Sequence, residues 1–182
     1  MDTFVNLTLS GLSTGMMIFL LASGLSLIFG LMGVLNFAHG SFFMWGAYTG
    51  VWVFSRTQSF IFAIMAGMAV GVVVGYLAEL TAVRRVYGKP VAQILITTGL
   101  MLVLNDVLKV FFGSNIIAAT VPPLLAGSWD LGGIIIVKYR IFTILMGLIV
   151  AVAVHLILTR TKIGMIVRAG AQSQEMVQVL GI

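Results

Sequence analysis

The sequence predicts an all-α integral membrane protein, a polytopic helical bundle with about five transmembrane helices. Hydrophobic residues make up 60% of the 182-residue chain and charged residues only 8%, whereas soluble domains carry roughly 25% charged residues. No Asp, Glu, Lys or Arg occurs between Asp2 and Arg56. A chain this poor in charge cannot cover a surface that faces water, so lipid is its solvent.

The lengths of the apolar runs define the predicted spans. A helix rises about 1.5 Å per residue and the hydrocarbon core is about 30 Å thick. The uncharged residues 3–55 would form a rod of roughly 80 Å, so this stretch must fold back once. The predicted spans are 7–30, 34–54, 59–80, 91–113 and 141–159, in a single transmembrane domain with an external loop at 114–140 and a cytoplasmic segment at 160–182.

The basic residues predict the orientation of these spans. With five spans, one side of the membrane receives Arg84, Arg85, Lys89, Arg160, Lys162 and Arg168, and the other receives Arg56, Lys138 and Arg140 together with Asp130. Cytoplasmic loops carry the excess of Lys and Arg. We therefore expect the N-terminus outside and the C-terminus in the cytoplasm. The net charge of +5 is explained by this topology and does not indicate nucleic-acid binding.

The stretch "GVLNFAHGSFFMWGAYTG" places two polar side chains, Asn36 and His39, where the first two spans meet. We expect both in the first turns of the second helix, between Gly33 and Gly40. Irregular backbone at membrane depth occurs where it is buried in protein or lines a watery cavity, and glycine-interrupted segments indicate transport sites. Two readings stay open: the pair satisfies backbone groups at a broken helix, or it contacts a substrate.

Two further sets of residues indicate packing. Gly67, Gly71 and Gly75 recur every four residues on one face of the third span, and small residues at this spacing let helices approach closely in lipid. In the fourth span, Asp106 and Lys109 are three residues apart. Such a pair can meet on one helix face, and we favour a structural ion pair over a functional one.

The loop at 114–140 contains Pro122-Pro123 and Gly132-Gly133, which break helices, and a β-branched run from Ile134 to Val137 that can pair as a short strand. We find no complete catalytic set: a hydrolase would have to use His39 and Ser41 without an evident orienting group. Histidines at metal-ligand spacing are also missing from the sequence, so we expect no metal site. The chain carries no phosphate-binding P-loop.

Two segments resemble a known family. "GLSLIFGLMGVLNFAHGSFFMWGAYTG" resembles the LivH-like permeases of branched-chain amino acid ABC transporters, whose signature corresponds here to Leu35, Asn36, Phe37, Ala38, His39 and Gly40. "TKIGMIVRAGAQSQEMVQVLGI" is similar to the family's segment that contacts the ATPase. Thr161 and Gly164 match the start of this segment, and by the resemblance the coupling residues are Arg168, Ala169, Ala171, Gln172, Glu175 and Gly181.

The resemblance implies the N-terminal portion of a permease subunit in an ATP-driven importer, which carries branched-chain amino acids or a related small neutral or zwitterionic solute. The implied partners are a second, LivM-like permease, two ATPase subunits that use ATP, and an extracytoplasmic solute-binding protein, all at a bacterial or archaeal cytoplasmic membrane. The chain itself would bind no cofactor and catalyse no reaction. The alternative is a passive channel for urea, amides or similar solutes, which would need no cytoplasmic coupling segment.

Overall fold

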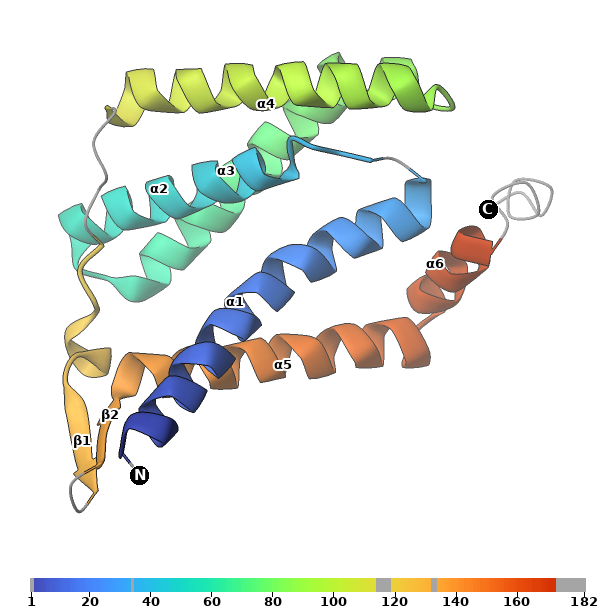
Figure 1. The fold of residues 1–182 in the computed structure, drawn as a ribbon. Helices are drawn as coiled ribbons and strands as arrows, with labels where there is room; N and C mark the ends of the chain where they lie inside the picture. Colours follow the sequence, from blue (N-terminus) through green and yellow to red (C-terminus); the bar gives the residue numbers. More distant parts are fainter. Residues whose placement is uncertain (1, 34, 114–118, 132–133, 173–182) are drawn as a thin grey trace. The chain divides into compact units, whose positions relative to one another are not determined.

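The computed structural model describes residues 2–33, 35–113, 119–131 and 134–172 (Figure 1). The long helices are α1 (Asp2–Met32), α2 (His39–Thr57), α3 (Phe60–Thr81), α4 (Pro90–Phe112), α5 (Lys138–Arg160) and α6 (Lys162–Gln172). Short 3-10 helices occupy Val83–Val86 (η1) and Pro123–Leu125 (η2), and two strands occupy Ser128–Leu131 (β1) and Ile134–Val137 (β2).

Within the described residues, four helical segments are long and apolar enough to cross a membrane: Thr3–Gly30, Phe60–Thr81, Pro90–Phe112 and Lys138–Arg160. The predicted class, an all-α polytopic membrane protein, is therefore confirmed. Helix α2 falls outside this set because His39, Arg56 and several small polar residues lower its hydropathy. That α2 forms a fifth span, and that the C-terminus lies in the cytoplasm, stay predictions.

The start of the second helix differs from the prediction. Helix α2 begins at His39, so Asn36 lies before the helix and not in its first turns. The physical reason is local, because the Asn36 side chain accepts a hydrogen bond from the Ala38 backbone N–H at 3.0 Å. Asparagine competes with helical hydrogen bonding in this way. Val34, where the span was expected to begin, lies outside the described residues.

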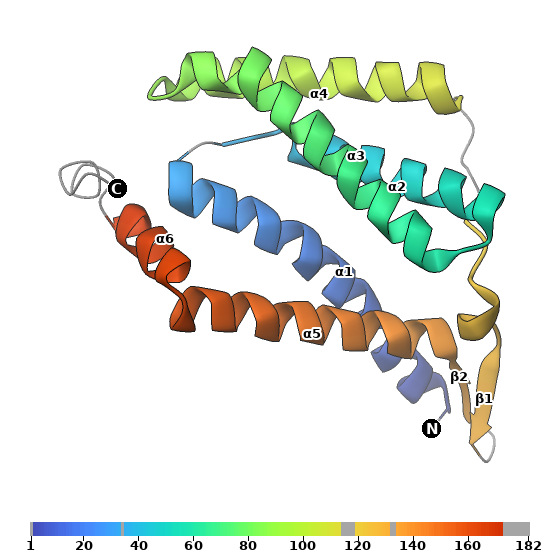
Figure 2. The ribbon, with the colours of Figure 1, turned by 180° about the vertical axis from the view of Figure 1, so that it is seen from behind.

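The chain divides into two compact units by its internal contacts, and the assignment of both units to a single transmembrane domain stays a prediction. In the unit Val34–Pro122, α2 and α3 form a helical hairpin and lie side by side in both views (Figures 1 and 2). The turn between them is closed by Gln58, which has a left-handed φ of 54° and donates its backbone N–H to the Phe54 carbonyl. Helix α4 packs on α2 and follows α3 through η1.

The second unit combines Met1–Gly33 with Pro123–Ile182. Helices α1 and α5 pack together, and α6 folds back against both. At the contact of α1 with α5, a Cβ on Gly147 would lie 2.7 Å from the Cβ of Met16. The predicted strand at Ile134–Val137 is confirmed as β2, which pairs antiparallel with β1.

Candidate functional site

The signature residues build the turn that leads into α2. Besides its side-chain bond to Ala38, Asn36 accepts the His39 N–H on its backbone carbonyl at 3.2 Å. The Ala38 carbonyl then accepts the Ser41 N–H at 2.9 Å. Ala38 is completely buried. Asn36 therefore satisfies backbone groups where the helix has not yet begun, as the structural reading of this residue requires.

Helix α4 holds this turn through Thr97, the largest fully buried side chain of the described chain. The Thr97 hydroxyl lies within hydrogen-bond distance of three carbonyl oxygens. Two belong to its own helix, those of Gln93 at 2.7 Å and Ile94 at 3.4 Å, and the third is that of Leu35 at 3.3 Å. The Leu35 carbonyl belongs to no helix, so the Thr97 hydroxyl offers it a partner from α4. A threonine on α4 thus fixes the signature segment against its neighbour.

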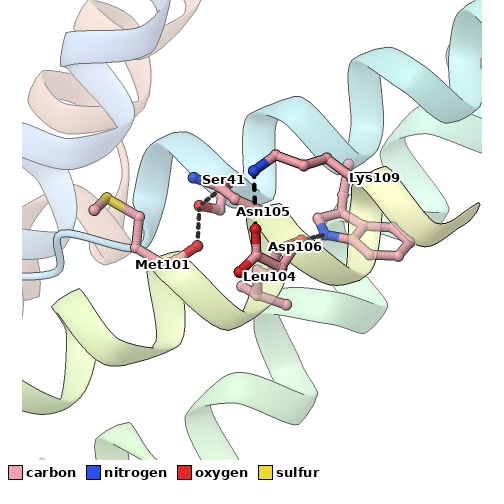
Figure 3. A network of polar contacts seen from close by, with 7 residues as sticks. Ser41, Met101, Leu104, Asn105, Asp106 and Lys109 are labelled. Carbon is pink, nitrogen blue, oxygen red and sulfur yellow. Dashed lines mark hydrogen bonds and ion pairs between the residues drawn. The ribbon is translucent and has the colours of Figure 1, made fainter. Parts of the chain in front are cut away.

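A second polar connection between α2 and α4 lies about two turns further along α4, at Asn105 (Figure 3). Ser41, which is only 3% exposed, donates its hydroxyl to the side-chain carbonyl of Asn105 at 2.9 Å. The indole N–H of Trp45 donates to the Leu104 carbonyl at 3.1 Å. Hydrogen bonds between helices in lipid are worth about 0.6–2 kcal/mol each. The Ser41 hydroxyl thus points to an amide oxygen and not to a basic nitrogen, an arrangement that does not activate a nucleophile.

His39 is the signature residue whose side chain has an unsatisfied polar atom. Among the residues that the structure describes, its Nδ1 atom is buried and has no hydrogen-bond partner. Buried polar atoms of this kind are uncommon and call for an explanation, such as an unseen water or a ligand. The neighbouring Phe37 is half-exposed, and a Cβ on Gly40 would have nothing within 4 Å.

The polar residues of α4 separate into two roles. Asn105 joins α2, whereas Asp106 and Lys109 form the ion pair that their three-residue spacing predicts, with Nζ and Oδ1 2.8 Å apart (Figure 3). Both side chains of the pair are exposed. Lys109 stands in the last turn of α4, so its ammonium group can reach the membrane surface. Within the described ranges, no three His, Asp or Glu side chains gather as metal ligands do.

Of the predicted glycine face, only Gly67 makes a close helix contact. A Cβ on Gly67 would lie 2.7 Å from the Gly46 carbonyl oxygen of α2, and one on Gly46 would lie 3.0 Å from the Gly67 oxygen. At Gly71 the nearest atom would be 3.9 Å away, and at Gly75 there is open space within 4 Å. Sequence reasoning missed Gly46, although the Gly46-Ala-Tyr-Thr-Gly50 spacing was a readable signal.

The connection between α3 and α4 is stabilised by Tyr87, which lies outside the candidate spans. Its hydroxyl donates to the Glu79 carboxylate at the end of α3. Two causes raise the pKa of Tyr87 above its usual range: partial burial, which contributes most, and this hydrogen bond to Glu79. The phenol therefore keeps its proton, and remains a donor, at every physiological pH.

The predicted coupling segment begins with a sharp turn between α5 and α6. Thr161 caps α6, because its Oγ1 accepts the Gly164 N–H at 3.1 Å, and caps of this type are worth about 1 kcal/mol. A Cβ on Gly164 would collide with the carbonyl oxygens of Ile157 and Leu158. Only glycine fits there. Arg168 and Ala169 are exposed, the backbone of Ala171 and Gln172 ends α6, and Glu175 and Gly181 lie outside the described residues.

These features define a multi-pass helical membrane protein with a buried polar turn at the start of α2. Residues 7–182 match the family described as "Branched-chain amino acid transport system / permease component". The chain belongs to this family, as the resemblance of its two motifs predicted.

Individual relatives agree with the family match. The chain is 26% identical to the high-affinity branched-chain amino acid transport system permease protein BraD of Pseudomonas aeruginosa, over 95% of this chain and 61% of the relative. It is 24% identical to the permease protein LivH of Escherichia coli K12, over 98% of this chain and 62% of that protein. The chain thus spans about three fifths of the length of these relatives. No solved structure matches it.

Proposed function

We propose that this chain is part of the permease subunit of an ATP-driven ABC importer for branched-chain amino acids or a related small neutral or zwitterionic solute. The observation that carries the proposal is the family match over residues 7–182. Relatives of this chain are named as permease proteins of high-affinity branched-chain amino acid transport systems.

The chemistry of the α2–α4 contact suits such a solute. Ser41, Thr97 and Asn105 are polar and uncharged, and the nearest ion pair, Asp106 with Lys109, is neutral as a unit. A route bordered by these neutral dipoles would offer no strong site for a net charge, since an unpaired ion is costly in an apolar medium. A solute with no net charge, including a zwitterion, avoids this cost.

The partners in this proposal are a second permease of the LivM type, two ATPase subunits and an extracytoplasmic solute-binding protein, in a bacterial or archaeal cytoplasmic membrane. ATP would be hydrolysed by the ATPase subunits and not by this chain. The α6 segment would contact an ATPase through exposed residues such as Arg168. Because Thr161 and Gly164 fix the turn before α6, a displacement of α6 by the ATPase would be transmitted to α5 and not absorbed by a flexible connection.

The test is reconstitution of the complete permease with the proteins that copurify with it, followed by measurement of leucine uptake with and without ATP. We expect uptake only with ATP. Arg168→Ala should lower transport-coupled ATP hydrolysis, while Arg85→Ala, an exposed arginine in η1, serves as the matched control. Uptake at the full rate without nucleotide would contradict the importer and favour the passive channel.

A further inference from the structure

The β1–β2 hairpin is attached directly to the start of a membrane span. Val137, the last residue of β2, is also the N-cap of α5, and Lys138 is the first residue of that helix. The Lys138 N–H donates to the Gly127 carbonyl at 3.2 Å and closes the base of the hairpin. No linker separates the two elements, so the hairpin lies wherever the beginning of α5 lies.

The length of α5 places its beginning at a membrane surface. Its 23 residues give a helix of about 34 Å, close to the hydrocarbon thickness of about 30 Å. The first residue of α5 is therefore near the boundary between hydrocarbon and headgroups. In both views the hairpin runs crosswise to α5 (Figures 1 and 2). When α5 crosses the membrane, a crosswise hairpin extends along the membrane surface instead of out into water.

The hairpin and the preceding turn expose large apolar side chains. We define the hairpin patch as Leu124, Trp129, Ile135 and Val137, which are exposed by 91%, 50%, 56% and 36%. The strand register sets Trp129 opposite Ile136 and Asp130 opposite Ile135, so the exposed apolar side chains occur on both faces. An apolar surface that stays in contact with water is unfavourable by roughly 25 cal/mol per Å².

Trp129 also stands next to a cation. The Lys138 ammonium nitrogen lies 5.8 Å from the centre of the Trp129 ring, within the range of a cation–π contact. Tryptophan prefers the headgroup level of a membrane, where its ring is apolar and its N–H is hydrated. A lysine at the same depth can reach lipid phosphates while its methylene groups stay with the hydrocarbon.

We propose that the hairpin patch lies in the lipid headgroup boundary and anchors the start of α5 there, with Lys138 directed to lipid phosphate. The occupant of this surface is the bilayer itself and not a soluble protein. The proposal explains why a strand pair with exposed tryptophan and isoleucine follows a proline-rich turn and meets a span without a polar linker. It is independent of the solute that the permease carries.

The test uses site-specific spin labels in the complete permease, reconstituted in vesicles of phosphatidylethanolamine and phosphatidylglycerol. The chain contains no cysteine, so each introduced thiol is the only labelling site within it. Labels are placed at Ile135→Cys and Leu124→Cys, exposed positions where the change removes no buried contact. Val152→Cys, exposed in the middle of α5, is the lipid control, and Arg84→Cys, exposed in η1, is the water control.

Collisions of each label with oxygen, which concentrates in lipid, are compared with collisions with a water-soluble nickel chelate. We expect the ratio of oxygen to nickel collision rates at both labelled positions of the hairpin patch to exceed the ratio at Arg84→Cys by roughly threefold or more, because an apolar probe partitions into lipid. The ratio should remain below that at Val152→Cys. Ratios equal to the Arg84→Cys value would overturn the proposal. Low collision rates with both reagents would overturn it too, because a protein surface, such as a solute-binding protein, would then cover the patch.

Discussion

The contact of Gly67 with Gly46 gives the sharpest prediction about stability. In Gly67→Ala, the new methyl carbon would lie 2.7 Å from the Gly46 carbonyl oxygen. This is about 0.7 Å shorter than the distance at which ordinary van der Waals contact begins, so α2 and α3 must separate. The atom in the way is backbone, which cannot rotate aside. Overpacking of this kind lowers the free energy of unfolding by about 1–3 kcal/mol.

The same face supplies a matched control. Gly75→Ala introduces the same methyl group into the same helix, where nothing lies within 4 Å. Replacing glycine by alanine within a helix raises the free energy of unfolding by about 0.5–1 kcal/mol, and this gain is common to both variants. The difference between them therefore isolates the helix contact. Gly46→Ala, where the methyl carbon would lie 3.0 Å from the Gly67 oxygen, should fall between the two.

The assay is reversible unfolding of the complete permease in mixed micelles, followed by circular dichroism and by the fluorescence of the tryptophans. We expect the order of stability to be Gly75→Ala first, then Gly46→Ala, then Gly67→Ala. If Gly67→Ala were as stable as Gly75→Ala, to within about 0.5 kcal/mol, the close approach of α2 and α3 would be refuted.

Three further predictions concern the turns of the chain. Asn36→Ala should lower the free energy of unfolding by about 1 kcal/mol, and Asn36→Ser should lower it less, as measured by thermal unfolding. Equal stability of the unchanged protein and both variants would exclude the side-chain bond to Ala38. Gly164→Ala should distort the α5–α6 turn and reduce ATP-coupled uptake more than it reduces membrane insertion, measured on the same vesicles; unchanged uptake would contradict the fixed turn. Tyr87→Phe should cause the same small loss of thermal stability at pH 7 and pH 9, because a phenol with an ordinary pKa near 10 is mostly protonated at both and the pKa of Tyr87 is raised further. A loss that disappears at pH 9 would mean that the tyrosine ionises there.

The sequence predicted the features that depend on local pattern. The candidate spans α3, α4 and α5 follow from apolar runs bounded by Arg56, Arg84 and Lys138, because hydropathy and length identify such helices with little help from tertiary contacts. The strand at Ile134–Val137 followed from β-branched residues. Its partner β1 was missed, since Ser-Trp-Asp-Leu alternates polar and apolar residues over only four positions and contains an aspartate, a residue that is depleted in strands.

The contacts between helices could not be predicted in the same way. Ser41 meets Asn105 across 64 residues of sequence, and a single sequence does not state which helices become neighbours. The start of α2 was placed too early because an apolar run says nothing about a side chain that captures the backbone, as Asn36 does. At Gly164 the need for glycine arises from the angle between α5 and α6, and that angle is a property of the packed structure.

The two polar residues of the signature, which the sequence left equivalent, are distinguished by their hydrogen bonds. The Asn36 side-chain oxygen receives the Ala38 N–H, and its backbone carbonyl receives the His39 N–H, so its accepting groups serve the turn itself. His39 has a buried Nδ1 atom with no partner in the described part of the chain. A buried polar atom is tolerated when something else completes its hydrogen bonding. Contact with a substrate stays a prediction, and His39 is the signature residue at which it is best tested, whereas the Asn36 side chain accepts a bond from the backbone of the turn. Because His39 begins α2, the turn that Asn36 builds also decides where the histidine ring is held.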